Sequence, residues 1–184
     1  MRIRNYFFIM GLPRSRTAWL SNWFTHELSI CVHDASRFCD NSQGMKKVLH
    51  RGDAFRPDWF KRRWYYGSAD SVNGWWYEGL NRQFPRARFA LIERDFDEVS
   101  YSCERLFNEN VDKELHALHE VHEHIKHNDN VYVINYERLN HPAVMQGLHE
   151  WLTPQVPFDN ARFNLLNDLD ITINPKKYFD ARCV

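Results

Sequence analysis

The chain has 184 residues, of which 43% are hydrophobic and 26% charged, a composition typical of a globular domain rather than of a disordered segment. Lys and Arg number 24, and Asp and Glu also number 24, so the formal net charge is zero and no general attraction to polyanions is indicated. The length predicts a single domain, 1–184, with a full hydrophobic core.

Cysteine usage and hydropathy give an expectation about location. The cysteines show no close paired spacing, which favours free thiols in a reducing compartment; they are Cys31, Cys39, Cys103 and Cys183. The apolar run 6–10 is too short for a signal peptide, and no run approaches the length of a membrane span. We therefore expect a cytoplasmic protein that does not enter a membrane.

Predicted strands and helices alternate along the chain. Strands are predicted near 5–10, 30–33, 64–67, 88–93 and 130–135, and helices near 16–28, 72–83, 97–126, 142–152 and 159–168, with a candidate break at 108–110. This alternation predicts an α/β fold with three layers, α/β/α, around a parallel sheet of about five strands. The segment 34–63 is rich in turn residues and is predicted to be an irregular loop.

The first predicted strand leads into a candidate phosphate-binding loop. Residues 5–20 combine a short apolar run, the turn Gly-Leu-Pro-Arg-Ser and an apolar helical pattern. Backbone N–H groups at a helix N-terminus favour anions, and Arg14, Ser15 and Thr17 add side-chain donors at the same place. The Walker motif is absent, because Arg16 and Thr17 stand where that motif needs Gly and Lys. An ordinary strand-turn-helix with a basic turn is the alternative.

A second candidate phosphate site follows the predicted strand 88–93. Arg94 stands at the carboxyl end of that strand, where open α/β sheets bind ligands. Its guanidinium offers a planar fork of donors to a phosphate. Ser102 comes eight residues later, two turns into the next predicted helix, where it can face the same groove. The alternative is an arginine paired with a nearby carboxylate.

These two stretches, and a third one at 131–139, resemble the sulfotransferase family. The family's 5′-phosphosulfate loop reads approximately G-x-P-[KR]-S-G-T-[ST]-W-L, its 3′-phosphate motif reads strand-R-[ND]-P-x-[DE]-x-x-x-S, and a later stretch reads strand-Y-E-D-L. The matching residues are Gly11, Pro13, Arg14, Ser15, Thr17, Trp19, Leu20, Arg94, Asp95, Glu98, Ser102, Tyr136, Glu137 and Leu139. Three positions depart from the pattern: Arg16 replaces Gly, Ala18 replaces Thr or Ser, and Phe96 replaces Pro.

The resemblance implies a fold, a donor and a set of binding residues. The fold would be that of the P-loop nucleotide hydrolases, and the sulfuryl donor would be 3′-phosphoadenosine 5′-phosphosulfate (PAPS), with no metal required. The 5′-phosphosulfate would be held by the loop residues Arg14, Ser15, Arg16, Thr17 and Ala18, and the 3′-phosphate by Arg94 and Ser102. Trp19 would stack on adenine, although a place in the core is equally open. Arg14 would also be catalytic, because it can neutralise charge growing on the leaving 5′-phosphate.

The resemblance also implies an acceptor, a small molecule or a carbohydrate with a hydroxyl or amine, and places the loop 34–63 on the acceptor side of the site. Such an acceptor needs a general base. His33 follows the second predicted strand and is one candidate, with Asp34 as its neighbour or substitute. Asp70 follows the third predicted strand and is the other candidate, although it could instead cap the helix that starts near Val72.

The sequence is also compatible with other functions. Basic and aromatic residues interleave over 46–66, a composition compatible with single-stranded nucleic acid, but a solvated basic face is favoured. The histidines of 116–127 lack zinc-protease spacing, so no metal site is expected there. A nucleotide- or polyanion-binding module without transfer activity is the alternative function. A kinase is disfavoured, because Gly-Lys-[ST] and a convincing Mg²⁺ carboxylate are missing.

Overall fold

A computed structural model describes residues 4–50, 64–107 and 111–169. Five strands form one sheet: β1 Asn5–Gly11, β2 Ser29–His33, β3 Tyr65–Ala69, β4 Arg88–Glu93 and β5 Val131–Asn135. The α-helices are α1 Thr17–Trp23, α2 Met45–His50, α3 Val72–Trp75, α4 Tyr77–Gln83, α5 Phe96–Phe107, α6 Asp112–Ile125, α7 Pro142–Leu152 and α8 Asn160–Asp168. Within these ranges the short 3-10 helices are η1 Ala35–Phe38, η2 Ser42–Gly44 and η5 Tyr136–Arg138.

The sheet is parallel and has the order β2-β3-β1-β4-β5, so the predicted α/β fold is confirmed. The chain leaves β1 toward β2 on one side and leaves β4 toward β5 on the other. The connections therefore diverge between the neighbouring strands β1 and β4, and ligands of open α/β sheets bind beyond the carboxyl ends at such a point. The two loops that the sequence singled out follow these two strands.

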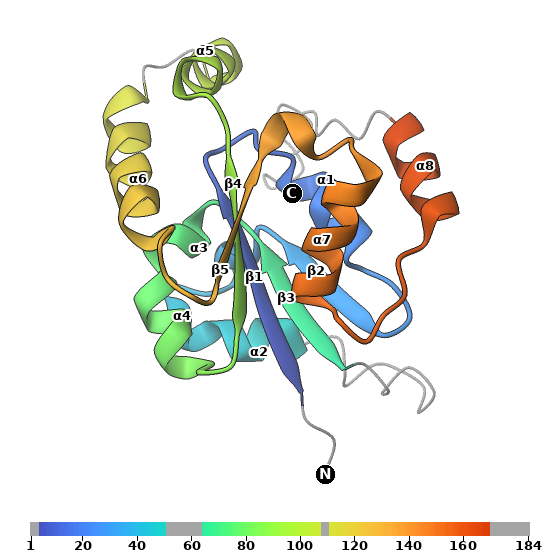
Figure 1. The fold of residues 1–184 in the computed structure, drawn as a ribbon. Helices are drawn as coiled ribbons and strands as arrows, with labels where there is room; N and C mark the ends of the chain where they lie inside the picture. The colour runs from blue at the N-terminus through green and yellow to red at the C-terminus, as the bar shows by residue number, and fades with distance from the viewer. Residues whose placement is uncertain (1–3, 51–63, 108–110, 170–184) are drawn as a thin grey trace, which may run out of the picture.

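Helices cover both faces of the sheet (Figure 1). The central strand β1 is buried on both sides, so its alternating side chains serve two cores. Phe7 and Ile9 pack in one core with residues of α1, α7 and α8. Phe8 and Met10 pack in the other core with residues of α2, α4 and α6. In a third cluster, α5 packs on α6.

Several predicted element ends differ from the structure. The helix predicted over 16–28 ends at Trp23, because the Thr25 hydroxyl bonds both the N–H and the carbonyl oxygen of Cys31 and so ties the following turn to β2. The helix predicted over 72–83 is divided at Trp76 into α3 and α4. The long helix ends at Phe107 and resumes at Asp112, on either side of the candidate break.

The segment 34–63, predicted to be irregular, contains η1, η2 and α2 in its first half. Helix α2 forms because Met45, Val48 and Leu49 recur at helical spacing and are buried against the sheet. Residues 51–63, including much of the basic and aromatic stretch, lie outside the described residues. Over the described ranges, no helix is both long and apolar enough to cross a membrane.

Candidate phosphate and acceptor site

The loop between β1 and α1 bends tightly at the carboxyl end of the central strand. A Cβ on Gly11 would meet the Ile92 carbonyl oxygen and the Ser15 Cβ at 3.1 Å, so the loop needs glycine there to pass close to β4. Arg14 and Arg16 both adopt positive φ, at 69° and 58°. Left-handed backbone costs a non-glycine residue about 1–2 kcal/mol. Such strain is concentrated at functional sites, where the surrounding structure holds it in place.

Ser15 lies at the bottom of this loop. Its side chain is fully buried, and its hydroxyl has no hydrogen-bond partner among the described residues. A buried polar group without a partner costs about 1–3 kcal/mol. A ligand oxygen that accepted from this hydroxyl would remove that cost.

Arg94 joins the two loops at the end of β4. Its Nη1 donates to the backbone carbonyl oxygen of Arg14 at 2.6 Å, and its guanidinium lies 4.2 Å from the ring centroid of Tyr136. Nη2 lies 3.5 Å from a carboxylate oxygen of Glu98, one turn into α5. The Nε of Arg94 is buried and has no acceptor within the described part of the chain. Arg94 is therefore paired with a carboxylate, as the alternative interpretation expected, through Nη2 but, among the described residues, not through Nε.

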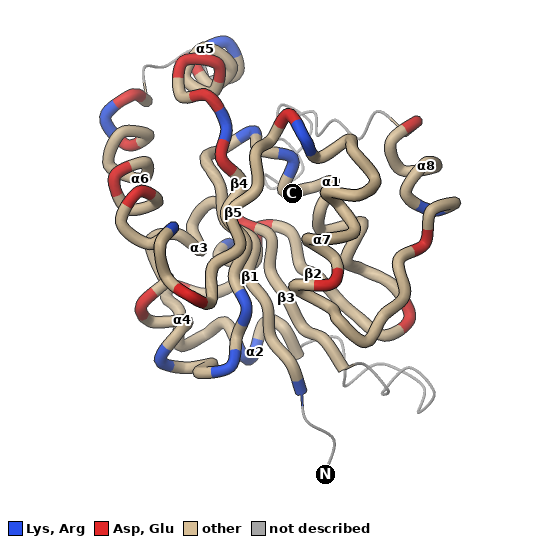
Figure 2. The backbone as a smooth tube through the Cα atoms, in the orientation of Figure 1, with Lys and Arg blue, Asp and Glu red and all other residues tan. Residues whose placement is uncertain are grey.

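Ser102 and Arg14 complete the arrangement. Arg14 Nε lies 3.4 Å from the Ser102 hydroxyl, although the two residues are 88 positions apart. A pocket of about 480 Å³ is lined by Arg14, Arg94, Glu98, Tyr101, Ser102, Arg105 and Leu106. Three guanidinium groups against one carboxylate give this pocket an excess of positive charge. Figure 2 shows Lys and Arg positions in blue along this edge of the sheet, beside the loop before α1 and at the end of β4.

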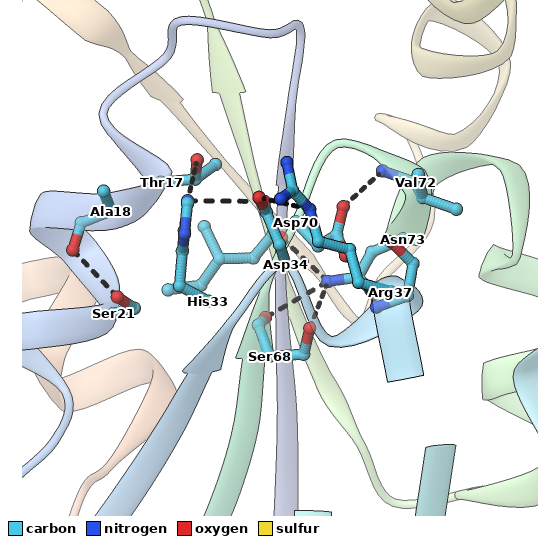
Figure 3. Close-up of polar contacts among 12 residues, drawn as sticks. Thr17, Ala18, Ser21, His33, Asp34, Arg37, Ser68, Asp70, Val72 and Asn73 are labelled. Atoms are coloured by element: carbon cyan, nitrogen blue, oxygen red, sulfur yellow. Dashed lines mark hydrogen bonds and ion pairs between the residues drawn. The ribbon is translucent and has the colours of Figure 1, made fainter. Parts of the chain in front are cut away.

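His33 stands at the carboxyl end of β2 and faces the same loop from the other side. Its Nε2 lies 3.2 Å from the Thr17 hydroxyl and 3.4 Å from a carboxylate oxygen of Asp34 (Figure 3). Asp34 adopts a φ of 49° and also pairs with Arg37 Nε at 3.0 Å. Burial lowers the pKa of His33, with a smaller opposing effect from Asp34 and Asp70. The imidazole is therefore neutral near pH 7 and able to accept a proton.

The Asp70 carboxylate is buried and bonded by backbone N–H groups. The residue is 2% exposed, and its two carboxylate oxygens accept from the backbone N–H groups of Ser36 at 2.9 Å and Val72 at 3.0 Å. These contacts join η1 to the start of α3 (Figure 3). One carboxylate oxygen thus contacts the first N–H of α3, the role that the sequence left open for Asp70, and the other holds η1.

Comparison with known structures identifies the fold. No family model and no curated protein sequence matches the chain. The sulfotransferase domain from the curacin biosynthetic pathway matches with a TM-score of 0.61 at 14% identity, over 87% of this chain and 77% of that one. This chain has the fold of the sulfotransferases. The likeness confirms the predicted sulfotransferase-like fold, and at this identity it concerns the fold alone.

Two further sulfotransferases show the same fold. Mouse sulfotransferase SULT7A1, complexed with PAP, has a TM-score of 0.54 at 14% identity, over 90% of this chain. This chain spans 65% of the length of the mouse protein. A sulfotransferase from Alicyclobacillus acidocaldarius has a TM-score of 0.55 at 15% identity, over 86% of this chain and 87% of that one.

Within this sulfotransferase fold, Arg16 turns its side chain away from the loop. Nη1 donates to the Asn140 side-chain oxygen, and Nη2 lies 3.5 Å from the Asn167 side-chain oxygen. Trp19 is 2% exposed, and its indole N–H donates to the Leu166 carbonyl oxygen at 2.9 Å. Trp19 thus occupies the core position that the sequence left open. The Ala18 carbonyl oxygen accepts from Ser21 and Asn22 within α1.

Four polar residues of this region were not predicted from the sequence: Arg37, Arg105, Asn140 and Asn167. Arg105 could have been found, because it follows Ser102 by three positions and so lies on the same face of α5. Asn140 and Asn167 gave no signal, since their role depends on where α7 and α8 pack. Among the described residues, no three His, Cys, Asp or Glu side chains gather as a metal site would require.

Proposed function

We propose that this protein transfers a sulfuryl group from PAPS to a hydroxyl or amine of a small-molecule or carbohydrate acceptor. The observation that carries the proposal is the meeting of two loops at the point between β1 and β4. There Arg14, Arg94 and Ser102 line one positively charged pocket, and the buried Ser15 follows Arg14 in the loop. The free state of the described cysteines Cys31, Cys39 and Cys103 is compatible with a cytoplasmic location.

The hydrogen-bond donors of the site suit a nucleotide that carries two phosphate groups. The Ser15 hydroxyl and Arg94 Nε are buried donors that lack acceptors in the described structure, and phosphate oxygens supply acceptors. Arg94 and Ser102 would hold the 3′-phosphate, and Ser15, Thr17 and the loop N–H groups the 5′-phosphosulfate. PAPS supplies the sulfuryl group; the protein positions it and stabilises charge.

Each side chain then has a separate task. Arg14 would neutralise the charge that grows on the 5′-phosphate as the sulfuryl group leaves. His33, neutral near pH 7 and in contact with Thr17, would accept the proton of the attacking acceptor. A hydrogen on Nε2 would bond the Asp34 carboxylate, 3.4 Å away, so Nδ1 would be the nitrogen that accepts the proton.

The test is transfer of radiolabelled sulfate from PAPS to a panel of hydroxyl and amine acceptors, with EDTA present throughout. We expect label in at least one acceptor with the natural chain and a loss of at least about 100-fold with an Arg14→Asn variant. A chain that binds the nucleotide but labels no acceptor would favour the alternative, a binding module without transfer activity. The absence of a hydroxyl at Ala18 and the replacement of the family's proline by Phe96 favour this alternative.

A further inference from the structure

The place where sulfotransferase resemblance implies an adenine ring is occupied by a side chain of this protein. The Arg16 guanidinium lies over the Trp19 ring, 4.5 Å from its centroid. Trp23 lies parallel to Trp19, with an interplanar angle of 7°, and Phe163 meets Trp19 edge-on. Because Trp19 is only 2% exposed, no face of its indole is open to a base.

Arg16 is held in this position by two helices. Its Nη1 donates to the Asn140 side chain just before α7, and its Nη2 reaches the Asn167 side chain near the end of α8. The backbone of Arg16 is in the left-handed region, with a φ of 58°. The guanidinium is therefore a fixed plane, and Arg16 itself is only partly buried.

We propose that the base of the bound nucleotide stacks on the Arg16 guanidinium, which rests in turn on Trp19. Planar guanidinium groups stack on aromatic rings and on nucleobases. Arg16 immediately precedes Thr17 in the phosphate-binding loop, so a base attached to a phosphate in that loop lies within reach. Asn140 and Asn167 then act as positioning residues for the stacking plane. This inference rests on the proposed function, since it requires the nucleotide phosphates to lie in the loop.

Stacking on a cation predicts a particular preference among nucleotides. A larger base gains more binding free energy from stacking, and stacking does not depend on the hydrogen-bonding groups of the base. Adenosine 3′,5′-bisphosphate should therefore bind more tightly than cytidine 3′,5′-bisphosphate by roughly five- to tenfold, the low end of base stacking on a planar side chain. The phosphates of the two ligands are identical, so the ratio of their affinities isolates the base.

The experiment measures both affinities by calorimetry in the natural chain and in Arg16→Gly and Arg16→Lys variants. Glycine tolerates the positive φ of this position, so Arg16→Gly removes the side chain without straining the loop. Lysine keeps the charge and loses the plane. Arg86→Ala, at an exposed arginine after α4, is the control for a lost surface charge.

We expect the adenosine-to-cytidine ratio to fall to about one in both Arg16 variants and to stay unchanged in Arg86→Ala. Asn140→Ala should lower the adenosine-to-cytidine ratio less than the Arg16 variants do, because the guanidinium is still present but loses one of its two side-chain contacts. A ratio that stays the same or rises in Arg16→Gly would overturn the inference, since it would mean that the base displaces Arg16 and stacks on Trp19. A natural chain that binds neither bisphosphate would overturn the inference and the proposed function together.

Discussion

Arg94 donates a hydrogen bond from Nη1 to the backbone carbonyl oxygen of Arg14 at 2.6 Å. This bond connects the ends of two neighbouring strands, β4 and β1, and holds a loop in which Arg14 adopts a strained positive φ. Arg94 therefore serves two purposes, because it holds the loop between β1 and α1 and also lines a pocket with Arg14.

The first prediction concerns Arg94. Replacing it by alanine removes a charge-assisted contact to the 3′-phosphate, so adenosine 3′,5′-bisphosphate should bind more weakly by about 2–4 kcal/mol. Ser102→Ala should cost less, about 1 kcal/mol, because it removes one neutral hydrogen bond. Calorimetry of both variants measures this, and their far-UV circular dichroism reports whether the fold is kept. Unchanged affinity in a folded Arg94→Ala variant would remove the 3′-phosphate assignment.

The second prediction separates catalysis from binding at Arg14. Asparagine tolerates the positive φ of this position and carries no charge, so Arg14→Asn tests the cation alone. We expect kcat to fall by roughly 10²–10³, because the charge on the leaving 5′-phosphate grows toward the transition state. Donor affinity should change much less. An equal loss in kcat/KM and in donor affinity, with kcat intact, would show that Arg14 only binds.

The third prediction compares the two candidate bases. His33→Ala should lower kcat by about 10²–10⁴ with donor affinity nearly intact, the usual contribution of a general base. Asp70→Asn should instead lower stability by about 1–3 kcal/mol, because one of its two backbone contacts is lost inside the protein. Transfer rates per folded molecule and urea unfolding distinguish the two. An inactive but stable Asp70→Asn variant beside an active His33→Ala variant would move the base to Asp70.

The pH profile gives a fourth prediction about His33. Burial lowers the pKa of His33, so its neutral, proton-accepting form persists below the ordinary histidine value of about 6.5. The acid limb of kcat/KM for the donor, which reports the free enzyme, should therefore lie below that value. Asp34→Asn removes a charge that favours the protonated form, so it should move this limb to still lower pH. A limb clearly above 6.5 would contradict the assignment.

The fifth prediction concerns His122 on α6 and stability. Burial lowers its pKa to about 4, and the side chain is 4% exposed. Between pH 6.5 and 4 the unfolded chain binds a proton at this residue that the folded chain does not, so stability falls as the pH falls. From pH 7 to pH 5 the loss from this one group should be about 1–2 kcal/mol. Urea unfolding of His122→Leu should show a correspondingly flatter pH dependence than the natural chain.

A residue's position was predictable where local sequence patterns determine it, and it was not where it depends on contacts between elements. The five strands were predictable because short apolar and β-branched runs alternate with helical patterns, and Arg94 and Ser102 were predictable because their spacing sets them on a strand end and the following helix. The end of α1 at Trp23 was not predictable, because it depends on the Thr25 hydroxyl bonding the backbone of Cys31, which the helical pattern of the sequence does not indicate. Trp19 had two equal interpretations, and only the packing of α8 places it in the core.

The direction of the Arg16 side chain was not predictable from the sequence either. Its departure from glycine was visible in the sequence, but the direction of its side chain depends on Asn140 and Asn167, more than a hundred residues away. The structure places that side chain outside the loop, so arginine at this position does not fill the space where phosphates would bind.

Calorimetry of adenosine 3′,5′-bisphosphate in EDTA, compared with ATP in Mg²⁺, is the decisive measurement for the proposed function. We expect the bisphosphate to bind without a metal ion and more tightly than ATP, and Arg94→Ala to weaken that binding. Binding of ATP that requires Mg²⁺, with no measurable binding of the bisphosphate, would show that the protein does not use this nucleotide.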